Sequence, residues 1–301
     1  MLSRKQRHMF LKLLGLFSVV RGYAIIVLVS AQVLTAVFIL SPNDSIGSVL
    51  KQIDLWLLIS ASSLAIAAGY IINNFYDKEK DLINRPKRSM LDRQVRQQTQ
   101  LTGYFLLNFC AVLLSSAVSF NAVLFFTGFI FLMWYYSHRL KKYLFIGNIS
   151  AAILSVMPLF VLVVYYRNFA PIILAHAGFL LLLLVLREVI KDLENLKGDL
   201  AQNYQTIPVV YGERVAKFWA TLLLALTYVT TVILLEYFPI GGMRYYFYAT
   251  ILMLLLFVGL LWRARDKKDY LMLHALLRLA IVVGIGSIVL LDFQKVQVIW
   301  S

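Results

Sequence analysis

The chain has 301 residues, of which 61% are hydrophobic and only 15% are charged, and its mean hydropathy is +0.78. A soluble domain is roughly 45–50% apolar and 25% charged, so this composition excludes an ordinary soluble protein. The net charge is +14, but the apolar runs leave only short loops and no basic domain outside the membrane. We therefore expect membrane lipids as partners and no nucleic acid.

The apolar runs predict nine transmembrane helices, at roughly 20 residues for each span. We expect an all-α membrane protein, a bundle of nine transmembrane helices with a central cavity that opens near the cytoplasmic face. A single polytopic domain covers residues 1–301. The predicted spans are residues 16–40, 55–76, 101–119, 122–138, 148–166, 170–190, 215–236, 244–262 and 272–292.

Turn-forming residues mark several span boundaries in chain order. Ser41-Pro42-Asn43-Asp44 ends the first span, and Ser119-Phe120-Asn121 is a short link between the third and fourth. Gly147-Asn148 opens the fifth span, and Pro171 suits the first turn of the sixth. Gly241-Gly242 lies between the seventh and eighth spans.

The distribution of basic residues predicts the orientation. Of the 29 Lys and Arg residues, only Lys51, Arg167, Arg244 and Lys295 fall on the face opposite the N-terminus, and Arg278 lies within the last span. All the others gather on the N-terminal face. We therefore expect an integral protein of an inner (plasma) membrane type, with a cytoplasmic N-terminus and the C-terminus on the opposite side.

Acidic residues concentrate after the second span. Asn73, Asp77 and Asp81 are spaced by four, so on a continuing helix they share one face, which we call the first acidic face. Like charges at this spacing repel by a few tenths of a kcal/mol in an isolated helix. A cation is therefore expected nearby.

A second acidic face follows the sixth span. Glu188, Asp192, Asn195 and Asp199 are spaced by four, three and four, which again places them on one side of a helix. The second and sixth spans run in the same direction, so both acidic faces lie at one membrane surface. Each face alone is compatible with a solvated helix end, but the repetition at equivalent helix ends favours a functional site.

Two opposed acidic faces suit a metal-bound diphosphate. Mg²⁺ takes one or two carboxylates, keeps several waters and completes its coordination with phosphate oxygens. As a Lewis acid it stabilises the charge that develops on a leaving diphosphate. The apolar bundle interior beside the acids suits a long hydrocarbon chain, so the predicted substrate is a prenyl diphosphate.

These residues resemble the UbiA-type intramembrane prenyltransferases, a family with nine transmembrane helices. The family's first motif, N-D-x-x-D-x-x-x-D, is matched here by Asn73-Asn74-x-x-Asp77-x-x-x-Asp81. Its second motif, often D-x-x-D-x-x-x-D, is matched by Asp192-x-x-Asn195-x-x-x-Asp199. The resemblance covers the whole chain and includes Asn84-Arg85-Pro86-Lys87-Arg88 and Gly147-Asn148.

Two positions depart from the family pattern. Asn74 and Asn195 stand where the motifs often have Asp. Each amide keeps an oxygen ligand but removes one negative charge, so we expect Mg²⁺ binding with a weaker affinity or an altered arrangement of ions. Glu188, one turn before Asp192, is a candidate to compensate.

The resemblance implies Mg²⁺-dependent prenyl transfer through an allylic cation that the bundle shields from water. The implied catalytic residues are Asp77, Asp81, Asp192 and Asp199. The implied Mg²⁺ ligands are Asn73, Asp77, Asp81, Asp192 and Asp199. The implied substrate-binding residues are Asn74, Arg85, Lys87, Arg88, Tyr135, Arg139, Lys141, Glu188, Lys191 and Asn195, with Tyr135 a candidate to flank the cation.

The residues around the two motifs bear on the identity of the acceptor. The motif surroundings most resemble the subgroup that transfers geranylgeranyl from its diphosphate to geranylgeranylglycerol phosphate, an ether-lipid precursor. An aromatic acceptor of quinone biosynthesis, such as 4-hydroxybenzoate, homogentisate or a naphthoate, is the alternative within the family. Outside it, a secondary transporter and a non-catalytic membrane scaffold remain open.

Overall fold

Every element assigned in the described part of the chain is a helix. The computed structural model describes residues 14–92, 95–292 and 295, without the side chains of residues 87, 88 and 91. The α-helices are α2 (Gly22–Leu34), α3 (Ile46–Leu50), α4 (Ile53–Tyr76), α5 (Lys78–Asn84), α6 (Pro86–Asp92), α7 (Gln97–Ser116), α8 (Phe120–His138), α9 (Ile146–Tyr166), α10 (Pro171–Ala201), α11 (Ile207–Tyr237), α12 (Arg244–Arg263) and α13 (Lys267–Ser287). A π-helix, η1 (Thr35–Leu40), continues α2, and short 3₁₀ segments are η2 (Leu140–Lys142), η3 (Gly241–Met243) and η4 (Ile288–Asp292).

Eight helical segments of the described chain are long and apolar enough to cross a membrane. They correspond to eight of the nine predicted spans, and α7 covers the remaining one. Helix α7 begins with the polar run Gln97-Gln98-Thr99-Gln100, and it does not belong to the eight. The prediction of an all-helical integral membrane protein is confirmed.

Some helices extend beyond the predicted spans or break within them. Helix α10 continues past the predicted span end at residue 190 to Ala201, as the helical spacing of Glu188, Asp192, Asn195 and Asp199 predicts. Helix α11 starts at Ile207 and bends at Gly212, whose φ of 83° favours glycine. The predicted first span is interrupted by a turn at Arg21, which has a φ of 50°.

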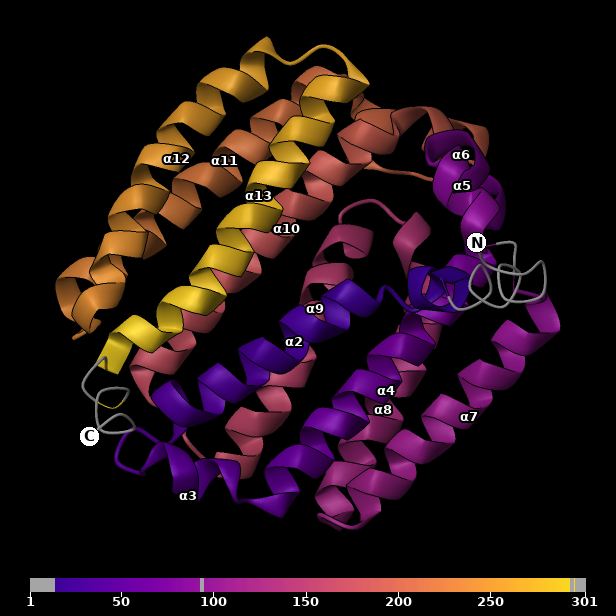
Figure 1. Cartoon of the computed structure of the whole chain (residues 1–301). Helices are drawn as coiled ribbons and strands as arrows, with labels where there is room; N and C mark the ends of the chain where they lie inside the picture. Colours follow the sequence, from indigo (N-terminus) through magenta and orange to yellow (C-terminus); the bar gives the residue numbers. More distant parts are fainter. Residues whose placement is uncertain (1–13, 93–94, 293–294, 296–301) are drawn as a thin grey trace, which may run out of the picture.

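The helices close into a ring. In the order α2, α4, α8, α9, α10 and α13, each helix contacts the next, and α13 contacts α2. Helix α7 packs outside α4 and α8, while α11 and α12 flank α10 and α13. Figure 1 shows α5 and α6 at one end of this bundle and α3 at the other.

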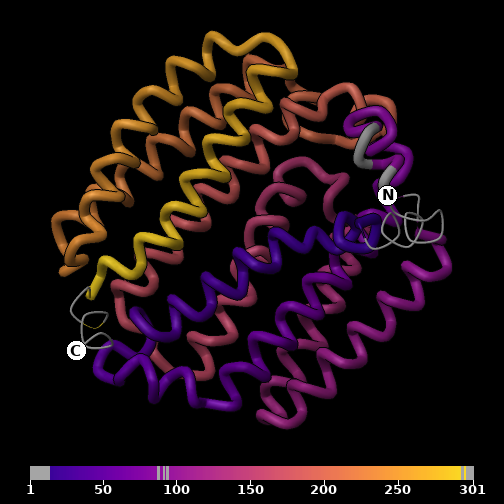
Figure 2. Tube along the Cα trace, viewed as in Figure 1, coloured from indigo at the N-terminus to yellow at the C-terminus, as the bar shows by residue number. Residues whose placement is uncertain are grey.

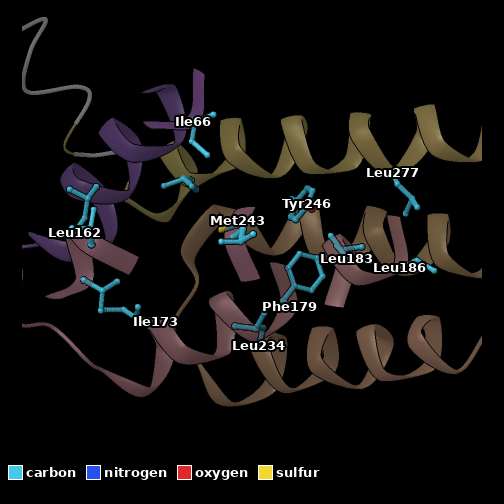
Figure 3. Close-up of a cluster of buried hydrophobic side chains, with 14 of the residues drawn as sticks. Ile66, Leu162, Ile173, Phe179, Leu183, Leu186, Leu234, Met243, Tyr246 and Leu277 are labelled. Atoms are coloured by element: carbon cyan, nitrogen blue, oxygen red, sulfur yellow. The ribbon is translucent and has the colours of Figure 1, made fainter. Parts of the chain in front are cut away.

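One buried hydrophobic cluster joins helices from both halves of the chain. It contains Phe179, Leu183 and Leu186 of α10 together with Leu55 of α4 and Leu277 of α13. Figure 3 shows the α10 side chains facing Tyr246 and Leu277. This packing fixes α4 and α10 within the ring, and their C-terminal ends lie at the same end of the bundle (Figure 2).

Candidate active site

The first acidic face lies at the junction of α4 and α5. Asp77 has φ −91° and ψ 4°, so α4 ends at Tyr76 and the continuous helix predicted through Asp81 is interrupted there. The hydrogen bonds between residues four apart nevertheless continue across this break. The Asp77 N–H donates to the Asn73 carbonyl at 2.9 Å, and the Asp81 N–H donates to the Asp77 carbonyl at 2.8 Å.

Lys141 of η2 neutralises part of this face. Its Nζ donates to Asp77 Oδ1 at 2.7 Å and to Asn73 Oδ1 at 3.3 Å. The Tyr204 hydroxyl donates to the same Asp77 oxygen at 2.9 Å. Gly147 allows Lys141 to reach this position, since a Cβ at Gly147 would lie only 3.0 Å from the Lys141 carbonyl oxygen.

The two carboxylates of the first face differ in protonation behaviour. Burial would raise the pKa of Asp77, but the Lys141 and Lys80 charges and the hydrogen bonds from Lys141 and Tyr204 hold that pKa well below its ordinary value. Burial and the neighbouring Asp77 carboxylate raise the pKa of Asp81. Asp77 is already compensated by cations, so Asp81 has more to gain from an added cation.

The second acidic face lies on the C-terminal part of α10. Asp192 Oδ2 accepts from Asn148 Nδ2 at 2.7 Å. Asn195 and Asp199 are buried, and neither Asn195 Oδ1 nor Asp199 Oδ2 has a hydrogen-bond partner in the described residues. Buried oxygens without partners are costly, so this face presents oxygen atoms suited to a cation.

The two acidic faces meet through contacts between α5 and α10. Lys80 Nζ lies 2.5 Å from Asp199 Oδ1. The Gly198 N–H donates to Asn84 Oδ1 at 3.2 Å, and a Cβ at Gly198 would collide with the Asn84 amide. The faces therefore lie against each other at one end of the bundle.

A buried ion-pair network borders the site. Glu194 of α10 accepts from Arg85 at 3.0 Å through Oε1 and contacts His274 Nδ1 of α13 at 2.5 Å through Oε2. Glu188 is likewise buried and pairs with Arg187 at 2.8 Å and Lys191 at 2.5 Å. Arg85, Lys191 and Glu188 are thus engaged in these pairs rather than with the aspartates.

Other predicted site residues lie away from the contact between the acidic faces. Asn74 donates to Gln100 at 3.4 Å and lines a cavity of about 160 Å³ beside α7. Arg139 donates to the Tyr143 hydroxyl at 2.8 Å and lines a second cavity of about 420 Å³. Tyr135 stacks on Phe131. The side chains of Lys87 and Arg88 lie outside the described residues.

Sequence reasoning missed four residues that contact the acids. Lys80 sits inside the first motif, where it was counted only as a topological charge, and Tyr204 follows α10 in a loop. The Tyr204 N–H donates to the Asp199 carbonyl at 2.9 Å, which directs the ring back to the site. Asn148 and His274 carried no spacing signal, because their acidic partners lie on other helices.

The available donors fit Mg²⁺. No group of three or more His, Cys, Asp or Glu side chains in the described residues is arranged to hold a metal by itself. Mg²⁺ does not need such a group, since it binds through one or two carboxylates with waters and substrate phosphates. Asp199 Oδ2 and Asn195 Oδ1 are hard oxygen donors of this kind.

A polytopic helical bundle with two opposed acidic faces at one end has the architecture of an intramembrane enzyme acting on an amphiphilic diphosphate. The family model for the UbiA prenyltransferase family matches residues 33–282. A digeranylgeranylglyceryl phosphate synthase from Thermococcus gammatolerans is 31% identical over 252 residues, which cover 82% of this chain and 89% of the relative. The chain belongs to the UbiA prenyltransferase family.

Solved structures share the fold. A structure described as digeranylgeranylglyceryl phosphate synthase in membranes has a TM-score of 0.68 at 20% identity, covering 93% of this chain and 98% of its own. A UbiA homologue from Archaeoglobus fulgidus, bound to DMAPP and Mg²⁺, has a TM-score of 0.64 at 15% identity. The match covers 90% of this chain and 99% of the homologue. The family prediction is confirmed, and with it the interpretation as a prenyltransferase rather than a transporter or scaffold.

Proposed function

We propose that this chain transfers a geranylgeranyl group from geranylgeranyl diphosphate to geranylgeranylglyceryl phosphate. The observation that carries the proposal is the contact of the two acidic faces, joined by Lys80 and Asp199 at 2.5 Å beside an apolar bundle. The relative from Thermococcus gammatolerans is named for a product with two geranylgeranyl groups on glyceryl phosphate. That name supports the ether-lipid acceptor over the aromatic alternative.

The reaction exchanges one C–O bond for another. The bond between C1 of the prenyl group and the diphosphate oxygen breaks, and the electron pair leaves with the diphosphate. The free hydroxyl oxygen of the acceptor forms a bond to C1, and the hydroxyl proton is released. The products are an ether and inorganic diphosphate, so no oxidant or reductant is required.

We propose Asn73, Asp77, Asp81, Asp192 and Asp199 as the Mg²⁺ site, with Asp77, Asp81, Asp192 and Asp199 as its catalytic carboxylates. When bound, Mg²⁺ supplies Lewis-acid stabilisation of the departing diphosphate. Lys141 binds and orients the diphosphate from η2, and Asn148 holds the Asp192 carboxylate in place. The buried aromatic and aliphatic residues of the ring exclude water from the allylic cation.

We assign the basic residues Arg85, Lys87, Arg88, Arg139 and Lys191 to the outer diphosphate- and acceptor-binding surface. Their clustering at the site end is supported by the ion pairs of Arg85 and Lys191 with buried acids of α10. Asn74, Tyr135, Glu188 and Asn195 complete the proposed substrate-binding set. Glu188 acts there as the partner that holds Lys191.

We propose that α7 completes nine membrane spans in a single polytopic domain over residues 1–301. The site end then faces the cytoplasm with the N-terminus, a central cavity opens there, and the C-terminus lies on the opposite side. The excess of Lys and Arg on the segments at the site end supports this orientation.

The test is incubation of purified protein with labelled geranylgeranyl diphosphate, Mg²⁺ and a panel of acceptors. The panel contains geranylgeranylglyceryl phosphate, 4-hydroxybenzoate, homogentisate and a naphthoate, and mass spectrometry identifies the product. We expect a second geranylgeranyl ether on glyceryl phosphate, and no product after chelation of the metal. A prenylated aromatic product alone would overturn the proposed acceptor, and no transfer to any acceptor would overturn the proposed function.

A further inference from the structure

Lys80 lies between the two acidic faces. Its Nζ is 2.5 Å from Asp199 Oδ1, and the side chains of Lys80 and Asp199 are only 14% and 0% exposed. The same ammonium lies 4.2 Å from the centroid of the Tyr204 ring, whose hydroxyl donates to Asp77. Lys80 lies next to Asp81 of the first acidic face and pairs with Asp199 of the second, so it is a cation held at their junction.

This arrangement differs from an exposed ion pair. Exposed pairs contribute little to stability and rearrange freely. Here the carboxylate is fully buried, and its second oxygen, Asp199 Oδ2, has no hydrogen-bond partner in the part of the chain described. Desolvation makes such a pair weak evidence for a stabilising role. A ligand-binding role accounts for both the buried cation and the remaining oxygen.

The charged side chains where the two acidic faces meet also favour a ligand-binding role. The ammonium groups of Lys80 and Lys141 pair with the carboxylates of Asp199 and Asp77, and Asp81 and Asp192 stand outside these two ion pairs. The amides Asn74 and Asn195 replace further acids of the motif pattern. Lys80 and Lys141 supply positive charge, and the two amides leave fewer acids to neutralise. The site therefore needs less charge from divalent cations to hold a diphosphate.

We propose that Lys80 is a diphosphate-binding residue that replaces part of the divalent charge. Its ammonium stays on Asp199 Oδ1 as a fixed cation for the prenyl diphosphate, while Asp199 Oδ2 and Asn195 Oδ1 remain available to Mg²⁺. This inference rests on the proposed function. It has a specific consequence, because Lys80 repels divalent cations and attracts the diphosphate.

The test measures binding in the absence of acceptor, by calorimetry on the purified full-length chain. Mn²⁺ alone is the first probe, and geranylgeranyl diphosphate at saturating Mn²⁺ is the second. In Lys80→Gln we expect the Mn²⁺ affinity to rise about ten-fold and the affinity for the diphosphate to fall about ten-fold. Lys80→Arg keeps the charge, so both affinities should stay within about three-fold of wild type.

Lys78→Gln is the matched control. Lys78 lies two residues earlier on α5, about 200° around the helix, and lines the cavity beside Asn74. It loses the same charge and should change neither affinity by more than about two-fold. Loss of both affinities in Lys80→Gln would indicate a structural role and overturn the proposal, and so would two unchanged affinities.

If Lys80→Gln does not fold, a second pair of variants tests the same role of Lys80. The double variant Lys80→Gln/Asp199→Asn leaves no unpaired buried charge, and it should bind geranylgeranyl diphosphate about ten-fold more weakly than Asp199→Asn alone. Equal affinities of these two variants would overturn the role of Lys80. A wild-type chain that binds neither Mn²⁺ nor the diphosphate would instead overturn the proposed function.

Discussion

The two ends of the bundle use charged side chains in different ways. At the end opposite the site, Lys295 donates to the backbone carbonyls of Val37 and Ser41 at 3.0 and 2.8 Å, and Asn168 donates to the Leu40 carbonyl at 3.1 Å. These carbonyls lie at the π-helix η1, where helical hydrogen bonding ends. The polar groups there complete backbone hydrogen bonds, which is a structural role.

At the site end, charged side chains pair with one another across helices. Lys80 pairs with Asp199, Lys141 with Asp77, and Arg85 with Glu194. Buried ion pairs repay little of their desolvation cost, so three of them at one end are poor evidence for stabilisation. Lys217 and Lys267 also donate to backbone carbonyls at the site end, so the difference between the ends lies in the interhelical ion pairs, which we expect to exchange partners with a ligand.

The largest expected effect is loss of a site carboxylate. Asp77→Ala and Asp192→Ala should each lower the rate of Mg²⁺-dependent prenyl transfer by about 10²–10³-fold or more, because the charge on the departing diphosphate loses its stabilisation. Steady-state transfer to geranylgeranylglyceryl phosphate measures this loss. Asp54→Ala is the control, since Asp54 begins the same helix α4 at the other end and accepts from Tyr165. Wild-type rates in both site variants would contradict the assignment.

A pair of lysine variants tests the same contrast with cations. Lys141→Met should lower kcat/KM for the prenyl diphosphate by about 10²-fold, since a charge-assisted contact to the diphosphate is lost. Lys295→Met should leave kcat/KM within about two-fold and lower the melting temperature instead, because two carbonyls lose their donor. Kinetics and thermal unfolding of both purified variants separate these outcomes. Equal losses of kcat/KM in Lys141→Met and Lys295→Met would contradict the different roles of the two ends of the bundle.

Sequence patterns predicted the helices well and the ion pairs poorly. Apolar runs of about 20 residues give a strong signal for membrane spans, and α4, α8, α9 and α12 end within a few residues of their predicted bounds. The acidic extension of α10 and the short α5 gave no such signal. In these polar stretches only the spacing of the acids predicts a helix, and tertiary contacts such as that between Asn84 and Gly198 stabilise it.

The candidate site shows the same limit. The spacing of Asp77 and Asp192 within their motifs identified the acids, because periodicity reports residues on one helix. Their cations and donors come from other elements, as Lys141 does from η2 and Asn148 from α9. A single sequence contains no periodicity for such interhelical contacts, and the pairing of Arg85 with Glu194 was therefore not predicted.

An intermediate effect is expected at the border of the site. Glu194→Gln removes the charge that holds Arg85 and His274, and its side chain is only 1% exposed. We expect a loss of about 1–3 kcal/mol of unfolding free energy and a lower melting temperature, because charged partners lose a buried acceptor. Prenyl transfer should fall about ten-fold or less, since the aspartates remain. Thermal unfolding in detergent and transfer kinetics measure the two effects.

Glu213→Gln is the control for this variant. Glu213 accepts from the neutral Tyr270 hydroxyl at 2.9 Å, and it holds no cation at the site. Its substitution should cost less than half as much stability, because a neutral hydrogen bond contributes less than one between charged groups. A greater loss in Glu213→Gln would contradict the special role of charge pairing at the site end.

The smallest effects are expected at Asn74 and Asn195, the two amides of the motifs. Asn195 Oδ1 is buried on the second acidic face without a hydrogen-bond partner among the described residues, whereas Asn74 donates to Gln100 and lines a cavity beside α7. Asn195→Asp should therefore raise the Mn²⁺ affinity about five-fold, because a charged ligand replaces a neutral one. Asn74→Asp should change it by less than about two-fold, since the new charge lies at the cavity beside α7 and is screened. Calorimetric titration of both variants with Mn²⁺ gives the ranking, and a stronger gain in Asn74→Asp would place the metal on the α7 side of the first acidic face.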